Sequence, residues 1–166
     1  MRTLIALFAL ITASPVWSDA PGNTQGDIRG HIRGPARVID GDTLWVGESQ
    51  VRLQGIDAPA LDQTCQTRKN KRQDCGQLAK QALARLVRGQ RVACKGNRTD
   101  SSGRLIALCR LGPFSINEQM VIDGWALAHG DGGEAYARAQ TFAKARREGI
   151  WRSRFTVPWE WRKTDR

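Results

Sequence analysis

Residues 36–59 read ARVIDGDTLWVGESQVRLQGIDAP, a series of short apolar segments separated by glycine and acidic residues. The segments Ala36–Ile39, Thr43–Val46 and Val51–Leu53 are rich in strand-forming residues, and each is bounded by Gly or Asp. An Asp-Gly pair between two apolar segments favours a tight turn, because glycine accepts a positive φ. The stretch therefore predicts three consecutive β-strands joined by turns.

Beyond this stretch the apolar period changes from two to about 3.6 residues, which predicts a helix over residues 76–88 that stops at Gly89. Two more strands, Arg91–Lys95 and Arg104–Leu111, flank a turn-rich loop, and helices are predicted over Ser115–Ile122 and Glu134–Arg147. The predicted inward residues are Leu78, Ala79, Ala82, Leu83, Leu86 and Val87 in the first helix, and Tyr136, Ala139, Phe142 and Ala143 in the last. Five strands with interspersed helices suit a small closed barrel.

Composition indicates a globular chain, and its charge favours an acidic or phosphorylated partner. Its 166 residues favour one domain. The 26 Lys and Arg against 16 Asp and Glu give a formal charge of +10, and arginine supplies 20 of the 26. Arginine binds phosphate and carboxylate through two parallel hydrogen bonds, so this excess favours a phosphorylated or acidic partner. The chain lacks the run of apolar residues that a membrane span needs, and it lacks the short repeats of a solenoid.

The ends of the chain are expected to lie outside the folded domain. Residues 1–18 resemble a signal peptide, with a charged Arg2, an apolar run and a break at Pro15. We expect export to the periplasm or the medium, and a monomer free of the membrane once this segment is removed. Residues 19–34 resemble a flexible linker, residues 35–151 the domain, and residues 152–166 a tail rich in Trp and Arg. The tail's aromatic residues either stack on bases or pack over the edge of the domain.

The four cysteines are expected to form two disulfide bonds, because their number is even and the chain is expected to be exported. If the two strands around the 96–103 loop are antiparallel neighbours, facing positions sum to 203, and Cys94 then faces Cys109. The remaining pair, Cys65 and Cys75, would close a short polar loop. Zinc binding is the rival interpretation, but the chain lacks C-x-x-C and the cysteine gaps match no zinc-finger spacing.

Acidic and cationic residues stand at the ends of the predicted strands. Asp40 and Asp42 flank the first turn, which by itself is only a hairpin signal; an EF-hand is excluded because Leu44 and Leu53 occupy ligand positions. Arg52 interrupts an apolar strand that Asp57 ends, so the pair forms either a plain ion pair or part of an anion site. The turn Thr99-Asp-Ser-Ser-Gly-Arg104 starts another strand with a second arginine.

Together with Ile116-Asn-Glu118 and Gly124-Trp-Ala126, a segment that favours packing over chemistry, these motifs resemble the staphylococcal-nuclease (thermonuclease) family. The resemblance runs from about Arg37 to Trp151. It implies a mainly β OB-fold, a five-stranded barrel with about three helices, that binds Ca²⁺ and hydrolyses phosphodiester bonds of DNA and RNA. The cysteines and the Trp-rich tail resemble exported bacterial members.

The resemblance also implies roles for single residues. Asp42 and Asp57 would ligate Ca²⁺ together with the backbone carbonyl of Thr43, and Asp40 would support the water shell of the ion. Hard oxygen ligands of this kind suit calcium. Arg52 and Arg104 match the two catalytic arginines that clamp the phosphate.

The sequence departs from the family at the general base. Where the family has a glutamate, this chain has Ala60, so the activity is expected to be weakened or lost; Asp62 and His129 are the candidate substitute bases. General-base catalysis contributes about 10²–10⁴-fold, which is less than the whole rate enhancement. The family's Lys-Tyr before the Gly-Arg turn is Ser101-Ser102, and its nucleotide-contacting tyrosines align with His129 and Asp131.

The basic run inside the Cys65–Cys75 loop has two interpretations. It is either a solvated surface loop or a site that binds the nucleic-acid backbone, which would make affinity fall steeply with salt. The residues concerned are Arg68, Lys69, Lys71 and Arg72. The alternatives to a nuclease are a catalytically silent module that binds nucleic acid or another polyanion, and a secreted structural protein with a vestigial site.

Overall fold

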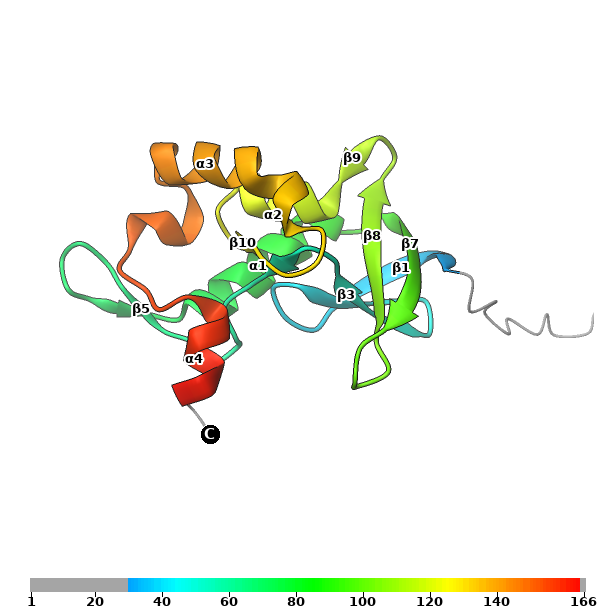
Figure 1. Cartoon of the computed structure of the whole chain (residues 1–166), viewed down its shortest axis with the longest axis horizontal. Helices are drawn as coiled ribbons and strands as arrows, with labels where there is room; N and C mark the ends of the chain where they lie inside the picture. Colours follow the sequence, from blue (N-terminus) through cyan, green and yellow to red (C-terminus); the bar gives the residue numbers. More distant parts are fainter. Residues whose placement is uncertain (1–29, 165–166) are drawn as a thin grey trace, which may run out of the picture.

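The computed structural model describes residues 30–164. Five strands form a closed barrel in the order β3-β2-β1-β7-β8, and a parallel pairing of β3 with β8 closes it (Figure 1). This topology confirms the predicted OB-fold. The strands are β1 (His31–Val38), β2 (Thr43–Val46), β3 (Ser49–Leu53), β7 (Arg91–Thr99) and β8 (Leu105–Leu111).

The first strand begins earlier than composition suggests. His31 pairs with Lys95, and Gly34 pairs with Val92, so residues 31–34 belong to the barrel. The expected linker therefore extends too far, because glycine and proline in an edge segment look like a loop until a partner strand is present. Residues 19–29 of that linker, the expected signal peptide over residues 1–18 and the last two residues of the tail lie outside the described residues.

Strands β7 and β8 have the register that the sum of 203 predicts. Cys94 faces Cys109 and is bonded to it, and the same register runs from Ala93 to Gly96. A β-bulge follows between Gly96 and Arg98, after which the register shifts by one residue. Bulges of this kind increase local twist, which a small closed barrel requires.

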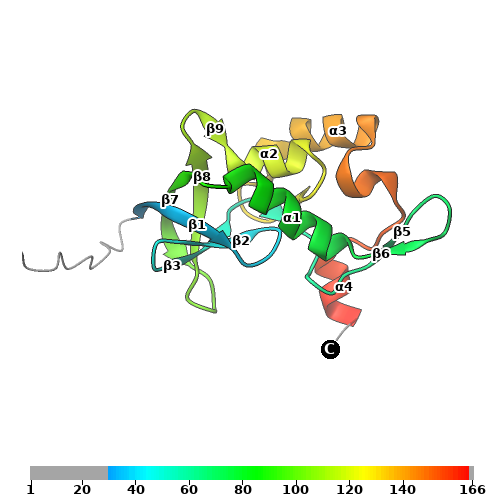
Figure 2. The ribbon, with the colours of Figure 1, turned by 180° about the vertical axis from the view of Figure 1, so that it is seen from behind.

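Residues 30–164 contain four α-helices, one more than the sequence predicts; the first two contact the barrel strands, the third packs on the second, and the fourth ends the tail (Figures 1 and 2). The predicted last helix is interrupted: a short 3₁₀ helix, η1 (Gly133–Tyr136), precedes α3. Of the residues predicted to face inward from this last helix, Tyr136, Ala139 and Ala143 are buried. The prediction is wrong for Phe142, whose ring is half exposed beneath the guanidinium of Arg146. The helices are α1 (Cys75–Val87), α2 (Ile116–Ile122), α3 (Ala137–Arg146) and α4 (Pro158–Thr164).

Helix α1 lies across the barrel and seals its core (Figure 2). Its predicted apolar stripe is buried at Ala79, Ala82, Leu83 and Val87, and Gly89 ends it at a φ of +67°. Helix α2 is fastened by the fully buried Asn117, whose side chain donates to two backbone carbonyls and accepts from a third residue's backbone N–H. The packing interpretation of this segment is therefore confirmed.

The remaining elements are short. Strand β4 (Ile56–Asp57) pairs with β10 (Leu127–Ala128), and β9 (Phe114–Ser115) extends β8. Strands β5 (Cys65–Gln66) and β6 (Arg72–Gln73) form a hairpin that projects away from the barrel (Figure 1). A 3₁₀ helix, η2 (Gly149–Arg152), leads from α3 into the tail. None of the helices within residues 30–164 is long and apolar enough to cross a membrane.

The Trp- and Arg-rich tail packs onto the domain, as the packing interpretation predicts. Arg154 pairs with Gln66 of β5 through two backbone hydrogen bonds of 2.8 and 2.9 Å. The buried side chain of Gln63 donates to the carbonyl of Thr156 at 2.6 Å. The tail then turns into α4, where the indole of Trp159 stacks on the imidazole of His129.

Candidate active site

Local hydrogen bonds fix the orientation of the acidic residues in the turn between β1 and β2. The carbonyl of Thr43 accepts from the backbone N–H groups of Ile39 and Asp40, and the side chain of Asp40 accepts from the N–H of Asp42 at 3.0 Å. An aspartate that bonds the backbone two residues on is a common turn-forming device. The carboxylate of Asp42 is thereby directed inward, where it is almost fully buried.

Glycine at position 41 lets this turn approach β4. A Cβ atom there would lie 2.6 Å from the Cβ of Ala58 and 2.8 Å from that of Ala79 in α1. The N–H of Ala58 donates to Oδ2 of Asp42 at 2.9 Å, so the turn and the end of β4 are tied together. Asp57 is the last residue of β4, and the close approach brings its buried carboxylate beside that of Asp42.

Arg52 binds both carboxylates. Its guanidinium lies 3.4 Å from Oδ1 of Asp42 and 2.9 Å from Oδ1 of Asp57. Burial alone would lower the pKa of Arg52, but the attraction of the two carboxylates outweighs burial and raises it. The sequence left open a plain ion pair or an anion site, and the structure contains the ion pair with a second carboxylate included.

Arg104 reaches the edge of the same cluster through Thr43. Its Nε donates to Oδ2 of Asp100 at 2.7 Å, and its Nη1 lies 3.5 Å from Oγ1 of Thr43, which itself donates to Asp42 at 2.9 Å. The slight burial of Asp100 would raise its pKa, but hydrogen bonds from Arg104 and Ser102 outweigh it and lower the pKa. Asp100 is thus a charged anchor that holds this guanidinium in place.

A third arginine completes the cluster, and the sequence did not point to it. Arg162 of α4 bonds Oδ2 of Asp57, so both oxygens of that carboxylate are occupied by guanidinium groups. Contacts between residues this far apart in sequence, here 105 positions, leave no periodic signal. The only hint was an arginine in an aromatic tail whose packing partner was unspecified.

The two carboxylates repel one another as well as attracting cations. Burial, and then the charge of Asp42, raises the pKa of Asp57, although Arg162 and Arg52 pull it down. Burial and the charge of Asp42 likewise raise the pKa of Asp40. A site that gathers acidic groups in a low-dielectric region favours a bound cation, because the cation relieves both burial and repulsion.

The donor set fits a hard divalent cation. Asp42 and Asp57 offer carboxylate oxygens, a ligand type that Ca²⁺ prefers. The carbonyl of Thr43 already accepts from the N–H groups of Ile39 and Asp40, so it would have to give up one of these bonds to bind an ion. Within residues 30–164 no group of three or more His, Cys, Asp or Glu side chains is arranged for a metal, so water would complete the coordination shell. A cation that used both oxygens of Asp57 would compete for them with Arg52 and Arg162.

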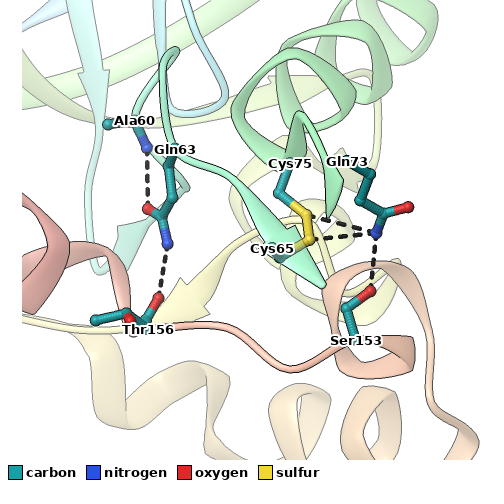
Figure 3. The surroundings of a disulfide bond; sticks show 7 residues. All are labelled: Ala60, Gln63, Cys65, Gln73, Cys75, Ser153 and Thr156. Carbon is teal, nitrogen blue, oxygen red and sulfur yellow. Dashed lines mark hydrogen bonds between the residues drawn. A yellow bond between two sulfur atoms is a disulfide. The ribbon is translucent and has the colours of Figure 1, made fainter. Parts of the chain in front are cut away.

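The candidate substitute bases are not part of this cluster. Asp62 is exposed, and within residues 30–164 its side chain forms no hydrogen bond or ion pair. His129 is exposed and stacked on Trp159, with ring centroids 4.0 Å apart and planes 7° from parallel. Asp131 forms an exposed ion pair with Arg98 at 2.6 Å. At position 60 the alanine N–H donates to the buried side chain of Gln63 (Figure 3).

The predicted disulfide bond between Cys65 and Cys75 is present and closes the β5–β6 hairpin. Nε2 of Gln73 lies 3.2 Å from Sγ of Cys65 and donates to Oγ of Ser153 at 2.8 Å (Figure 3). The hairpin is therefore tied to the start of the tail. Its four basic residues, Arg68, Lys69, Lys71 and Arg72, are all exposed.

Comparison with known proteins places this site in context. The model of the staphylococcal nuclease homologue family matches residues 50–153. Protein ParB of Escherichia coli is 32% identical, covering 98% of this chain and 90% of its own length. The succinoglycan biosynthesis protein ExoI of Rhizobium meliloti is 33% identical over 74% of this chain and 65% of its own length. An uncharacterized endonuclease of Escherichia coli is 29% identical over 98% of both chains.

Proposed function

Because the chain belongs to the staphylococcal nuclease homologue family, we propose that it is an exported, Ca²⁺-dependent nuclease of DNA or RNA with weakened activity. The observation that carries this proposal is the convergence of Asp42 and Asp57 with Arg52 and Arg104 at one site. Two disulfide bonds support export, because disulfides persist in oxidising compartments. We propose that the protein acts as a monomer.

In this proposal Asp42, Asp57 and the carbonyl of Thr43 hold the ion, and Asp40 accepts hydrogen bonds from its water shell. When bound, Ca²⁺ supplies positive charge that neutralises a phosphate oxygen and polarises a water molecule. Burial of the two carboxylates serves this role, because a low dielectric strengthens their hold on a cation.

Arg52 and Arg104 would bind the other oxygens of the scissile phosphate. Each guanidinium is held by carboxylates before substrate arrives: Arg52 by the two buried aspartates, and Arg104 by Asp100. Fixed donors need no reorganisation when charge develops on the phosphate in the transition state, so they lower the barrier. A fork of two N–H groups also fits phosphate better than an ammonium does.

The proton on the attacking water has no evident acceptor in this cluster. Position 60 carries a methyl group where the family resemblance implies a carboxylate. Asp62 and His129 stay the proposed substitutes, together with water at the site itself. Loss of a general base costs about 10²–10⁴-fold, so a slow rate is expected from the arginines and the cation.

The direct test is cleavage of denatured DNA and of RNA by the mature protein with Ca²⁺ or with a chelator. Cleavage is expected with Ca²⁺ only, and Asp42→Asn is expected to abolish it because one of two carboxylate ligands is lost. Equal cleavage in chelator would show that a contaminant or a metal-free reaction is responsible. Activity is measured from acid-soluble product at high protein concentration.

The alternative function is binding of nucleic acid or another polyanion without cleavage. Ala60 favours it, and so does the ion pair of Arg162 with Asp57, which occupies the proposed metal ligand. Under this alternative, the direct test gives no metal-dependent product while a gel shift still detects the complex. Because one relative is a succinoglycan biosynthesis protein, succinoglycan is included as a competitor in the gel shift.

Replacing Arg162 by glutamine is expected to tighten Ca²⁺ binding by about tenfold. The guanidinium now occupies Oδ2 of Asp57, and an ion pair worth about 1.4 kcal/mol corresponds to a factor of ten in affinity. Titration calorimetry measures the dissociation constant. Lys163→Gln is the matched control, because it removes the same charge from the next, exposed residue of α4. Equal affinities in the two variants would contradict the competition.

A further inference from the structure

A cavity of about 820 Å³ opens between the β5–β6 hairpin and the segment that joins α3 to the tail. It is lined on one side by residues of the hairpin loop and on the other by the end of α3 and by η2. We call it the cationic groove, because six of its lining residues are basic: Arg68, Lys69, Lys71, Arg146, Arg147 and Arg152. The residues of the carboxylate cluster do not line it.

Most of this charge is uncompensated. Glu148 pairs with Arg152 at 3.0 Å and with Arg146 at 3.8 Å. Within residues 30–164, the other four basic residues of the groove have no carboxylate within ion-pair distance. Side chains of like charge that face one another repel, so a ligand carrying several negative charges is favoured over a single carboxylate.

The walls of the cationic groove are fixed to each other. The Cys65–Cys75 disulfide closes the hairpin at its base, and Gln73 donates to Ser153 across the gap (Figure 3). Arg154 also pairs with Gln66 through backbone hydrogen bonds. A groove whose walls are already joined loses little conformational entropy when a ligand binds. The disulfide and the hydrogen bonds therefore keep the cationic side chains close together although they repel one another.

The lining of the groove also includes two apolar side chains, one of them aromatic. Leu78 of α1 and Trp125 line it, and both are only half buried. Indole rings stack on nucleobases, and this stacking adds to the attraction between the cations and the phosphates. Cations around a half-exposed tryptophan are the combination found where proteins bind single-stranded nucleic acid.

We propose that the cationic groove is a second nucleic-acid-binding site, which holds the phosphates of a single strand while Trp125 stacks on one base. The choice of ligand rests on the proposed function, but the site is separate from the proposed catalytic cluster. Arg72, the fourth basic residue expected to bind the backbone, lies outside the lining, whereas Arg146, Arg147 and Arg152 were not expected from the sequence. The groove would retain the strand between slow cleavage events.

The test measures binding of a fluorescein-labelled 12-nucleotide DNA by anisotropy, with the full mature chain in chelator. Two double variants, Lys69→Gln/Lys71→Gln and Arg146→Gln/Arg147→Gln, each remove two charges from one wall. Each is expected to weaken binding about tenfold or more and to reduce the slope of log affinity against log salt by about 1.4, or 0.7 per phosphate. Arg88→Gln/Arg91→Gln is the matched control at the other end of α1, where both residues are exposed.

Three outcomes decide the matter. Groove variants that bind like the control overturn the proposal. If Trp125→Leu leaves DNA affinity unchanged and heparin binds with the same dependence on the groove variants, the groove recognises charge alone, and the nucleic-acid assignment is wrong. The proposal is supported if the groove variants and Trp125→Leu all weaken DNA binding while Trp125→Leu leaves heparin binding unchanged. Because no metal is present, these results stand whether or not the Ca²⁺-dependent cleavage test succeeds.

Discussion

Replacing Ala60 by glutamate is expected to raise nuclease activity by about 10²-fold or more. The expected reason is that a carboxylate at this position supplies the missing acceptor for the proton of the attacking water. The backbone at residue 60 is well fixed for this purpose: its N–H is bonded to Gln63, whose own side chain is fully buried and donates to Thr156. Initial rates with denatured DNA and Ca²⁺ measure the effect.

Ala60→Gln is the control for this prediction, because it has the same shape without the charge. The glutamate variant should be much faster than the glutamine variant, and its rate should rise with pH through the titration of the new carboxyl group. If both variants cleave at the rate of the native protein, the geometry around position 60 is not that of the family. In that case another group accepts the proton, and Asp62→Asn and His129→Gln become the informative variants.

Much of the fold could be predicted because its determinants are local. Glycines and aspartates bound the first strands, the apolar stripe defines α1, and the facing of Cys94 and Cys109 follows from a single antiparallel register. The start of β1 could not be predicted, because the strand there consists of residues typical of a loop and depends on pairing with β7. The exposure of Phe142 likewise depends on how α3 packs, which its sequence period does not specify.

The sequence could predict only those residues of the candidate site that belong to a short motif. Arg52 and Asp57 are five residues apart, and an arginine in an otherwise apolar strand favours an anion nearby, so their pairing follows from the sequence. Arg162 and Trp159 reach the site from a helix at the other end of the chain. Nothing in a Trp- and Arg-rich tail specifies which carboxylate it contacts. The second wall of the cationic groove was missed for the same reason.

The second large effect is expected from Arg104→Gln, which should reduce the turnover rate by about 10²–10³-fold, the typical cost of removing one fixed donor to a developing oxyanion. Arg104 is a better probe than Arg52, because removal of Arg52 leaves two buried carboxylates without their shared partner and so also perturbs folding. Removal of Arg104 frees Asp100 and the hydroxyl of Thr43, but leaves the buried carboxylates of Asp42 and Asp57 with their own partners. Single-turnover kinetics with saturating enzyme isolate the chemical step.

Arg104→Lys separates charge from geometry. It keeps the positive charge but loses the planar fork, so it should recover only part of the rate that the glutamine variant loses. Calcium affinity and thermal stability should stay close to those of the native protein in both variants, because neither Asp42 nor Asp57 loses a direct partner. A glutamine variant that cleaves at the native rate would mean that Arg104 does not contact the phosphate in the transition state. The same result, together with unchanged DNA affinity, would leave Arg104 as a partner of Asp100 that merely shapes the turn before β8.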